Sequence, residues 1–236
     1  MGGARRLAVG GVCGLLLAGF AAACGERDDD ARRAANGAPT GSAAPTASSG
    51  ASSDALDLRR SGDLTFYQLF NQDGADGKGH YDDLDEGARA TTAVVVARVV
   101  DVVVTRFFQG EAADDRFPMI GVVLRPTDVV SGSLPPEFGD RLTVEFVGAT
   151  GSDEEDVAKL KRRLPAQPGL WFLHLKSQGL PEERGFFRPI SPQGLFVQGN
   201  QGVETPLTTD GDGDMAAEGR TYRRLSALVQ RVRGVR

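Results

Sequence analysis

Eight valines fall within the segment Ala93 to Thr105. Each carries two heavy atoms on its Cβ, which restricts its rotamers in a helix and suits it to the pleated backbone of a strand. The segment is apolar at both odd and even positions and is interrupted by Arg98 and Asp101. We therefore predict a long strand, buried on both faces for most of its length, that bends or bulges near the charged residues.

Further strands and short helices follow from the same kind of pattern. The alternation of Leu142, Val144 and Phe146 with Thr143, Glu145 and Val147 predicts a strand with one buried face. In all, strands are expected at 93–105, 117–130, 141–147, 169–176, 186–190 and 194–198, with Pro126 marking an edge or a bulge. Short helices are expected at 61–71, 82–91, 154–164 and 213–236.

These elements predict a mainly β fold with short flanking helices, either a small β-barrel of the OB type or a β-sandwich. The motifs V-S-G-S-L-P, G-D-x-L-x-V-x-F, P-G-L-W-F-L-x-L and Q-G-L-F-V occur in this order between residues 130 and 197. In that order the chain is similar to an uncharacterised class of exported bacterial β-domains. The resemblance implies no activity.

Composition and charge exclude several classes of protein. The chain has 236 residues, of which 40% are hydrophobic and 25% charged, and this balance argues against collagen, coiled coils and polytopic membrane proteins. Its formal net charge is −5, whereas nucleic-acid-binding domains usually present a basic face. We therefore expect a folded domain that does not bind nucleic acid.

The first 30 residues have the layout of an export signal. Arg5 and Arg6 precede an uncharged apolar stretch at 7–20, then Ala21, Ala22, Ala23 and Cys24, and then a polar run. Small residues directly before a cysteine resemble the lipobox of bacterial lipoprotein precursors, although Ala21 stands where that family usually has leucine. The resemblance implies cleavage between Ala23 and Cys24, loss of residues 1–23, and a lipid on Cys24.

The lipobox resemblance places the mature protein at the cell membrane, lipid-anchored on the extracytoplasmic face. Two alternatives stay open. The residues Ala21-x-Ala23 also fit an ordinary signal-peptidase site, which would release a secreted protein. The uncharged stretch from Leu7 to Cys24 is at the lower length limit for an uncleaved membrane-spanning helix, and its glycines weaken that helix.

A linker is expected to separate the anchor from the folded domain. Residues 25–55 contain no Val, Ile, Leu, Met, Phe, Trp or Tyr. Such a segment cannot bury enough apolar surface to offset the loss of chain entropy, so we predict disorder. The predicted organisation is a signal peptide at 1–23, a lipidated cysteine with a disordered linker at 24–55, and one β-rich domain at 56–236.

No catalytic motif is recognisable. The chain lacks G-x-S-x-G and H-E-x-x-H, and its only histidines are His80 and His174. We expect His174 to be a half-buried strand residue and His80 to be solvated in a Gly-rich loop. The only cysteines, Cys13 and Cys24, lie in the signal region and supply no zinc ligand to the folded domain, so no resident metal or cofactor is predicted.

Asp210, Asp212 and Asp214 form a D-x-D-x-D pattern, which is typical of the start of a calcium loop with oxygen ligands. An EF-hand would continue with Gly and a later Glu, where this chain has Met215 and Thr221. The three aspartates are therefore a weak candidate for cation binding. The competing interpretation is a polar turn in which Asp214 caps the last helix. A second acidic segment, with Asp82 and Asp83 at its end, lacks the alternating ligand spacing, so it is interpreted as an ordinary solvated loop with cation binding as the weaker alternative.

The leading hypothesis is a lipid-anchored extracytoplasmic binding domain without catalytic activity, whose partner is an envelope protein or polysaccharide. One alternative is an envelope enzyme that works with carboxylates alone. Another is a lipoprotein that binds a small molecule or a cation. A cleft with two facing carboxylates would favour the enzyme, and an exposed apolar surface without such a cleft would favour the binding domain.

Overall fold

A computed structural model describes residues 52–58, 63–70, 80–109, 116–148, 154–176, 181, 184–208 and 214–235. These residues belong to one unit of the chain, Thr46–Arg236. The predicted signal peptide, the predicted lipidation at Cys24 and most of the predicted linker lie outside the described residues. None of the described helices is long and apolar enough to cross a membrane.

Strands account for most of the described secondary structure. They are β1 (Ala93–Gln109), β2 (Arg116–Gly132), β3 (Leu142–Val147), β4 (Gly169–Leu175), β5 (Phe187–Pro189), β6 (Leu195–Gln198) and β7 (Val203–Glu204). The helices are α1 (Ser53–Leu56), α2 (Asp63–Gln68), α3 (Leu84–Ala90), α4 (Glu154–Lys161), α5 (Asp214–Arg220) and α6 (Leu225–Arg233), with a 3-10 turn η1 (Pro136–Phe138).

Five of the strands close into a ring. The sheet order is β1-β2-β3-β5-β4-β6-β7, and β1 pairs with β4 as well as with β2. The pairing of β3 with β5 is parallel and the other pairings are antiparallel. The ring is a small barrel of the OB type, with α4 in the connection from β3 to β4. The prediction of a mainly β fold is confirmed, and of its two architectures the barrel is the one formed.

The valine-rich segment forms the long strand that the sequence predicts. Its pairing with β2 contains register shifts, one of them between Val99 and Asp101. These irregularities bend β1, so that its first half also pairs with β4 and closes the ring. On β2, Pro126 lies beyond the pairing with β3 and beside another register shift, as expected of a residue without a backbone N–H.

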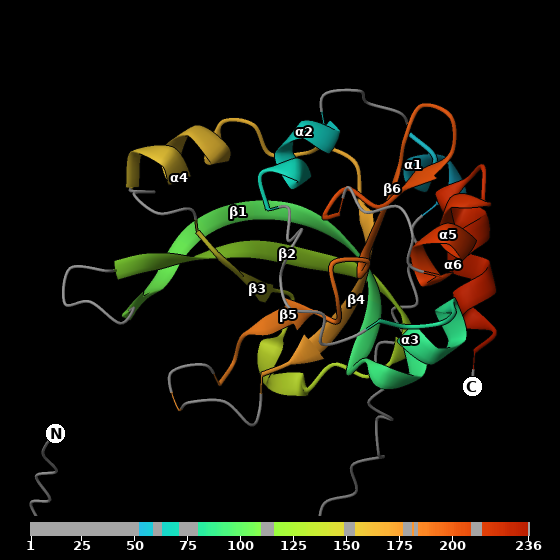
Figure 1. Cartoon of the computed structure of the whole chain (residues 1–236), viewed down its shortest axis with the longest axis horizontal. Helices are drawn as coiled ribbons and strands as arrows, with labels where there is room; N and C mark the ends of the chain where they lie inside the picture. Colours follow the sequence, from blue (N-terminus) through green and yellow to red (C-terminus); the bar gives the residue numbers. More distant parts are fainter. Residues whose placement is uncertain are drawn as a thin grey trace, which may run out of the picture. The chain divides into compact units, whose positions relative to one another are not determined.

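The barrel has two hydrophobic cores, because β1 and β4 are buried on both faces. One core fills the barrel interior and includes Trp171 and Phe187. The other lies outside the barrel, between the outer faces of β1 and β4 and the helices α1, α3, α5 and α6. Figure 1 shows α3, α5 and α6 together on one side of the barrel, while α2 and α4 lie over another side.

The structure corrects two expected boundaries. The single helix expected over 213–236 is two helices, because buried Gln198 interrupts it. The Gln198 amide donates to the Arg223 carbonyl at 3.1 Å and accepts from the Leu225 N–H at 2.8 Å, on either side of the extended Arg224 that precedes α6. Among the described residues, α1 also includes Ser53 to Ala55, which were expected to belong to the linker, because Leu56 is buried in the outer core.

Candidate functional site

Helix α2 leaves one large apolar side chain facing out. Phe66 and Tyr67 are buried in the barrel core, and the turn after the helix places Phe70 there as well. Leu69 lies in the same turn and is 63% exposed. Leu64, Tyr67 and Phe70 recur at helical spacing and pack against the barrel core, whereas this spacing assigns no contact to Leu69.

A pocket lies between this turn and helix α4. Its volume is about 310 Å³ and its walls are mostly apolar. The lining residues are Leu69, Phe70, Ile120, Val147, Gly148, Asp156, Val157, Lys159, Leu160 and Arg163. Pockets that bind small ligands commonly have this size and consist of apolar walls with a few polar groups.

The pocket has a buried inner wall and an exposed mouth. Phe70, Ile120 and Val157 are buried, and the Phe70 ring packs against Phe146 with centroids 4.9 Å apart. By contrast, Leu69 and Val147 are largely exposed, and Val147 is 69% exposed at the end of β3. An apolar ligand would therefore cover side chains that water now contacts.

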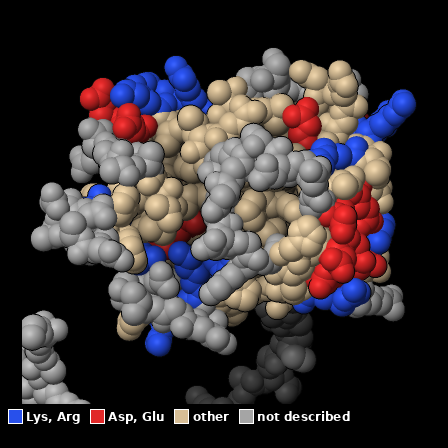
Figure 2. All heavy atoms as spheres, in the orientation of Figure 1, with Lys and Arg blue, Asp and Glu red and all other residues tan. Residues whose placement is uncertain are grey.

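The polar side of the pocket comes from α4 and the residues after it. Lys159 contacts Asp156 at 2.9 Å and Glu155 at 3.5 Å. The hydrogen bond that Lys159 donates to the Asp156 carboxylate raises the pKa of Lys159, which keeps that side chain cationic. Arg163 follows the end of α4 and is exposed. Over α4, basic and acidic side chains lie close together (Figure 2).

No protein-family model matches this chain, and neither the curated proteins nor the solved structures contain a match.

A second polar site lies on the outer face of the barrel. Glu145 of β3 is buried, and its carboxylate accepts hydrogen bonds from Thr105, from Arg106 at 3.2 Å and from Lys176 at 2.9 Å. Burial raises the pKa of Glu145, but the bonds from Arg106, Thr105 and Lys176 outweigh it and hold the pKa below its ordinary value. This ion-paired group ties β1, β3 and β4 together.

Sequence reasoning missed the Glu145 cluster. The strand pattern places Glu145 on the face opposite the barrel core, which predicts a solvated residue. Arg106 and Lys176 lie far from it in the sequence, so only the strand order brings them together. No local signal in the sequence indicates the pairing.

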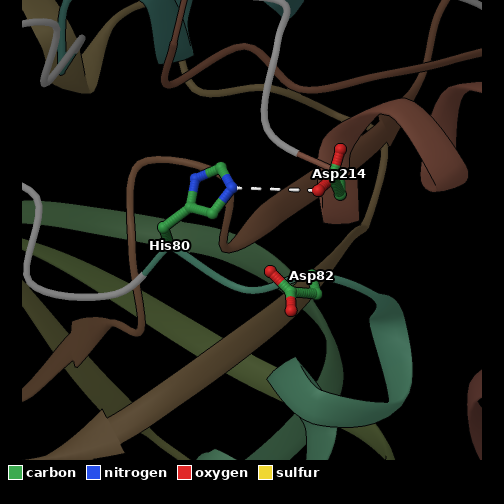
Figure 3. A group of neighbouring side chains, drawn as sticks. All are labelled: His80, Asp82 and Asp214. Carbon is green, nitrogen blue, oxygen red and sulfur yellow. Dashed lines mark ion pairs between the residues drawn. The ribbon is translucent and has the colours of Figure 1, made fainter.

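A further cluster consists of His80, Asp82 and Asp214, and Asp214 is one of the three residues of the predicted cation site. Figure 3 shows the imidazole of His80 directed at Asp214, with Asp82 beside them. The ligand atoms of the three side chains lie within 4.8 Å of one another, and His80 Nε2 is 4.0 Å from Asp214 Oδ2. Asp210 and Asp212, the other two residues of the prediction, lie outside the described residues.

Backbone contacts hold the ends of α3 and α5 together at this cluster. The Met215 N–H donates to the Tyr81 carbonyl at 3.2 Å, and Glu218 accepts from the Leu84 N–H at 2.9 Å. His80, Asp82 and Asp214 are all exposed. Nitrogen and oxygen ligands of a tetrahedral zinc lie roughly 3.4 Å apart, given metal–ligand bonds of about 2.0–2.2 Å. The 4.0 Å between His80 Nε2 and Asp214 Oδ2 therefore requires a small side-chain movement before a zinc ion is bound.

The remaining residues of interest have mostly structural roles. His174 is partly buried on β4, as expected. Its pKa is lowered mainly by burial and to a smaller extent by the positive charge of Arg188. Phe107 and Phe108, near the end of β1, are both exposed. Arg116 stacks on the Phe107 ring, 3.8 Å from its centroid.

Proposed function

We propose that this chain is an exported, lipid-anchored binding domain without catalytic activity, and that the pocket between α2 and α4 takes a small apolar ligand. The observation that carries the proposal is the pocket itself, with its buried apolar inner wall and the exposed Leu69 and Val147 at its mouth. This choice develops the small-molecule alternative from the sequence. An envelope protein or polysaccharide remains the other class of partner.

The pocket lacks the pair of facing carboxylates that a hydrolytic enzyme of this kind needs among its described lining residues, so a binding role is favoured. Among the described residues, Asp156 is the one carboxylate in the lining, and it is paired with Lys159. A mechanism with two carboxylates needs a second one facing the first across the substrate. The paired Asp156 offers no such arrangement.

The binding test uses a neutral fluorescent probe, N-phenyl-1-naphthylamine, with the full chain carrying Cys24→Ala so that no lipid of its own competes. We expect the probe to bind. Val147→Glu should lower the affinity for the probe at least tenfold, because it places a charge on the apolar wall. Val129→Glu is the matched control, because Val129 is also an exposed strand valine, 43% exposed, and does not line the pocket. Equal binding by both variants would refute the pocket as the site.

The location of the protein needs its own test. Wild type should fractionate with membranes and Cys24→Ala should not, because the lipid on Cys24 is the proposed anchor. Mass spectrometry of the mature N-terminus should find a modified residue 24. An unmodified N-terminus on membrane-associated protein would contradict the anchor but leave the pocket proposal standing.

A further inference from the structure

We infer that the ligand of the pocket is a single-chain amphiphile with an anionic head group, its chain along the apolar wall and its head beside Arg163. This inference rests on the proposed function, because it names the ligand class for the same pocket. It is carried by the size of the pocket, its division into apolar and charged sides, and the pairing of its charged residues.

The size and lining favour one apolar chain. A volume of about 310 Å³ is at the lower end of the range for ligand pockets, which is too small for the body of a two-chain lipid. Six lining residues with apolar side chains, from Leu69 in the turn after α2 to Leu160 on α4, surround the space. The chain of the ligand would contact Phe70, Ile120 and Val157, which form the buried wall.

The charge at the mouth selects the head group. Two of the three charged lining residues, Asp156 and Lys159, pair with each other at 2.9 Å. The third is Arg163, for which no ion pair with a described carboxylate is found. Arg163 is exposed and lines the pocket, and a guanidinium offers several N–H donors in a fork that fits a carboxylate or phosphate.

The position of Arg163 after α4 does not by itself explain its presence in the pocket. Cations are favoured near a helix C-terminus, and Arg162 and Arg163 both follow α4. Only Arg163 is among the residues that line the pocket. Arg162 is therefore a matched control that shares the helix end and the exposure but lacks the contact with the ligand space.

The experiment compares ligands that differ only in their head groups. Decanoate, 1-decanol and decyltrimethylammonium displace N-phenyl-1-naphthylamine from the full chain carrying Cys24→Ala. We expect decanoate to displace the probe at a concentration about three- to fivefold lower than decanol, the size of effect given by an exposed charge pair, and the cation to be weakest. Arg163→Gln should remove the preference for decanoate, and Arg162→Gln should keep it.

The outcomes separate the two proposals. If the probe does not bind wild type, the proposed function fails and the inference fails with it. If the probe binds but the three amphiphiles displace it equally, the inference is overturned while the pocket remains a ligand site. Loss of the decanoate preference in Arg162→Gln as well would also overturn it, because the effect would then come from general charge. A parallel titration with lysophosphatidylglycerol distinguishes a phosphate head from a carboxylate head within the same ligand class.

Discussion

The helices on the two sides of the barrel differ in how completely they fill the space beneath them. Under α3, α5 and α6 the large apolar side chains are almost fully buried. A Cβ on Gly219 would lie 2.1 Å from the Phe196 ring, and one on Gly87 would lie 2.6 Å from the sulfur of Met215. These close approaches leave no apolar hollow at Gly87 or Gly219, and a hollow of about 300 Å³ at the start of α6 is lined by the polar residues Asp54, Asp57, Gln198 and Arg224.

The side covered by α2 and α4 is filled less completely. Besides the pocket, a second hollow of about 350 Å³ lies between α4 and β1, lined by Val103, Val104, Val157, Ala158 and Lys161. Helix α4 therefore has open space beside it toward β1 as well as toward α2. The comparison teaches that one barrel carries both a close-packed cover that stabilises it and a loosely packed cover that leaves apolar surface for a ligand.

The largest expected difference between the two sides is in stability. Leu228→Ala, on the closely packed side, should lower the free energy of unfolding by about 3 kcal/mol, because it leaves a cavity in a packed core. Leu69→Ala, on the pocket side, should change it by less than about 0.5 kcal/mol, because that side chain is mostly exposed. Urea unfolding of both variants measures the difference, and equal losses would contradict the comparison.

The next effect tests the polar contact that connects α6 to the barrel. Gln198→Ala should cost about 2 kcal/mol, because it leaves the buried Leu225 N–H and the Arg223 carbonyl without their partner. The control is Gln201→Ala, since Gln201 is an exposed glutamine near the same strand. Unfolding in urea checks both, and a loss of less than about 0.5 kcal/mol for Gln198→Ala would show that water replaces these contacts.

The strands were predictable because their signal is local. Valine content and the alternation at 142–147 depend on neighbouring residues, and both strands form where expected. The break in the last helix was not predictable, because the residue that causes it, Gln198, lies 27 positions before Leu225. A continuous apolar stripe from Tyr222 to Val232 looks like one helix until that contact is known.

The candidate site was less predictable than the fold, for the same physical reason. The pocket combines Leu69 of the α2 turn, Val147 of β3 and Leu160 of α4, which only the tertiary structure brings together. The cation prediction recognised Asp214 from a local motif but treated His80 as an isolated loop residue. The contact between the ends of α3 and α5, which places His80 beside Asp214, has no counterpart in the local sequence.

A smaller effect on the free energy of unfolding is expected from the titration of Glu145, which lies on the outer face of β3 two residues before Val147. The folded pKa of Glu145 is below its ordinary value, so its stabilising contribution is present above the unfolded pKa, about 4.3, and is lost as pH falls through the folded pKa. Glu145→Gln should therefore be less stable than wild type near neutral pH, and the gap should narrow as the pH is lowered to about 3.

The pH series is measured by urea unfolding at several pH values, with Glu137→Gln as the control because Glu137 is exposed. The expected pattern is a narrowing gap for Glu145→Gln and little change for the control. A gap for Glu145→Gln that stays constant with pH would contradict the lowered pKa and the role of Arg106 and Lys176 in holding the carboxylate charged.

The smallest effect is expected where α3 meets α5, at the exposed pair of His80 and Asp214. Their 4.0 Å separation in water contributes little, so His80→Ala should change the free energy of unfolding by less than about 0.5 kcal/mol in metal-free buffer. The neighbouring Glu218→Gln should cost more, because Glu218 accepts from the Leu84 N–H and contacts Arg231.

Calorimetric titration of wild type and Asp214→Asn separates a surface ion pair from a cation site where α3 meets α5. An imidazole with carboxylates suits zinc better than calcium, so calorimetric heat with zinc that is absent in Asp214→Asn would identify Asp214 as a ligand. Heat with calcium but not with zinc would instead favour the oxygen-ligand loop that the D-x-D-x-D pattern predicts. If neither ion gives heat, the cation prediction is wrong, and the pocket under α2 and α4 is left as the ligand site proposed for the described part of the chain.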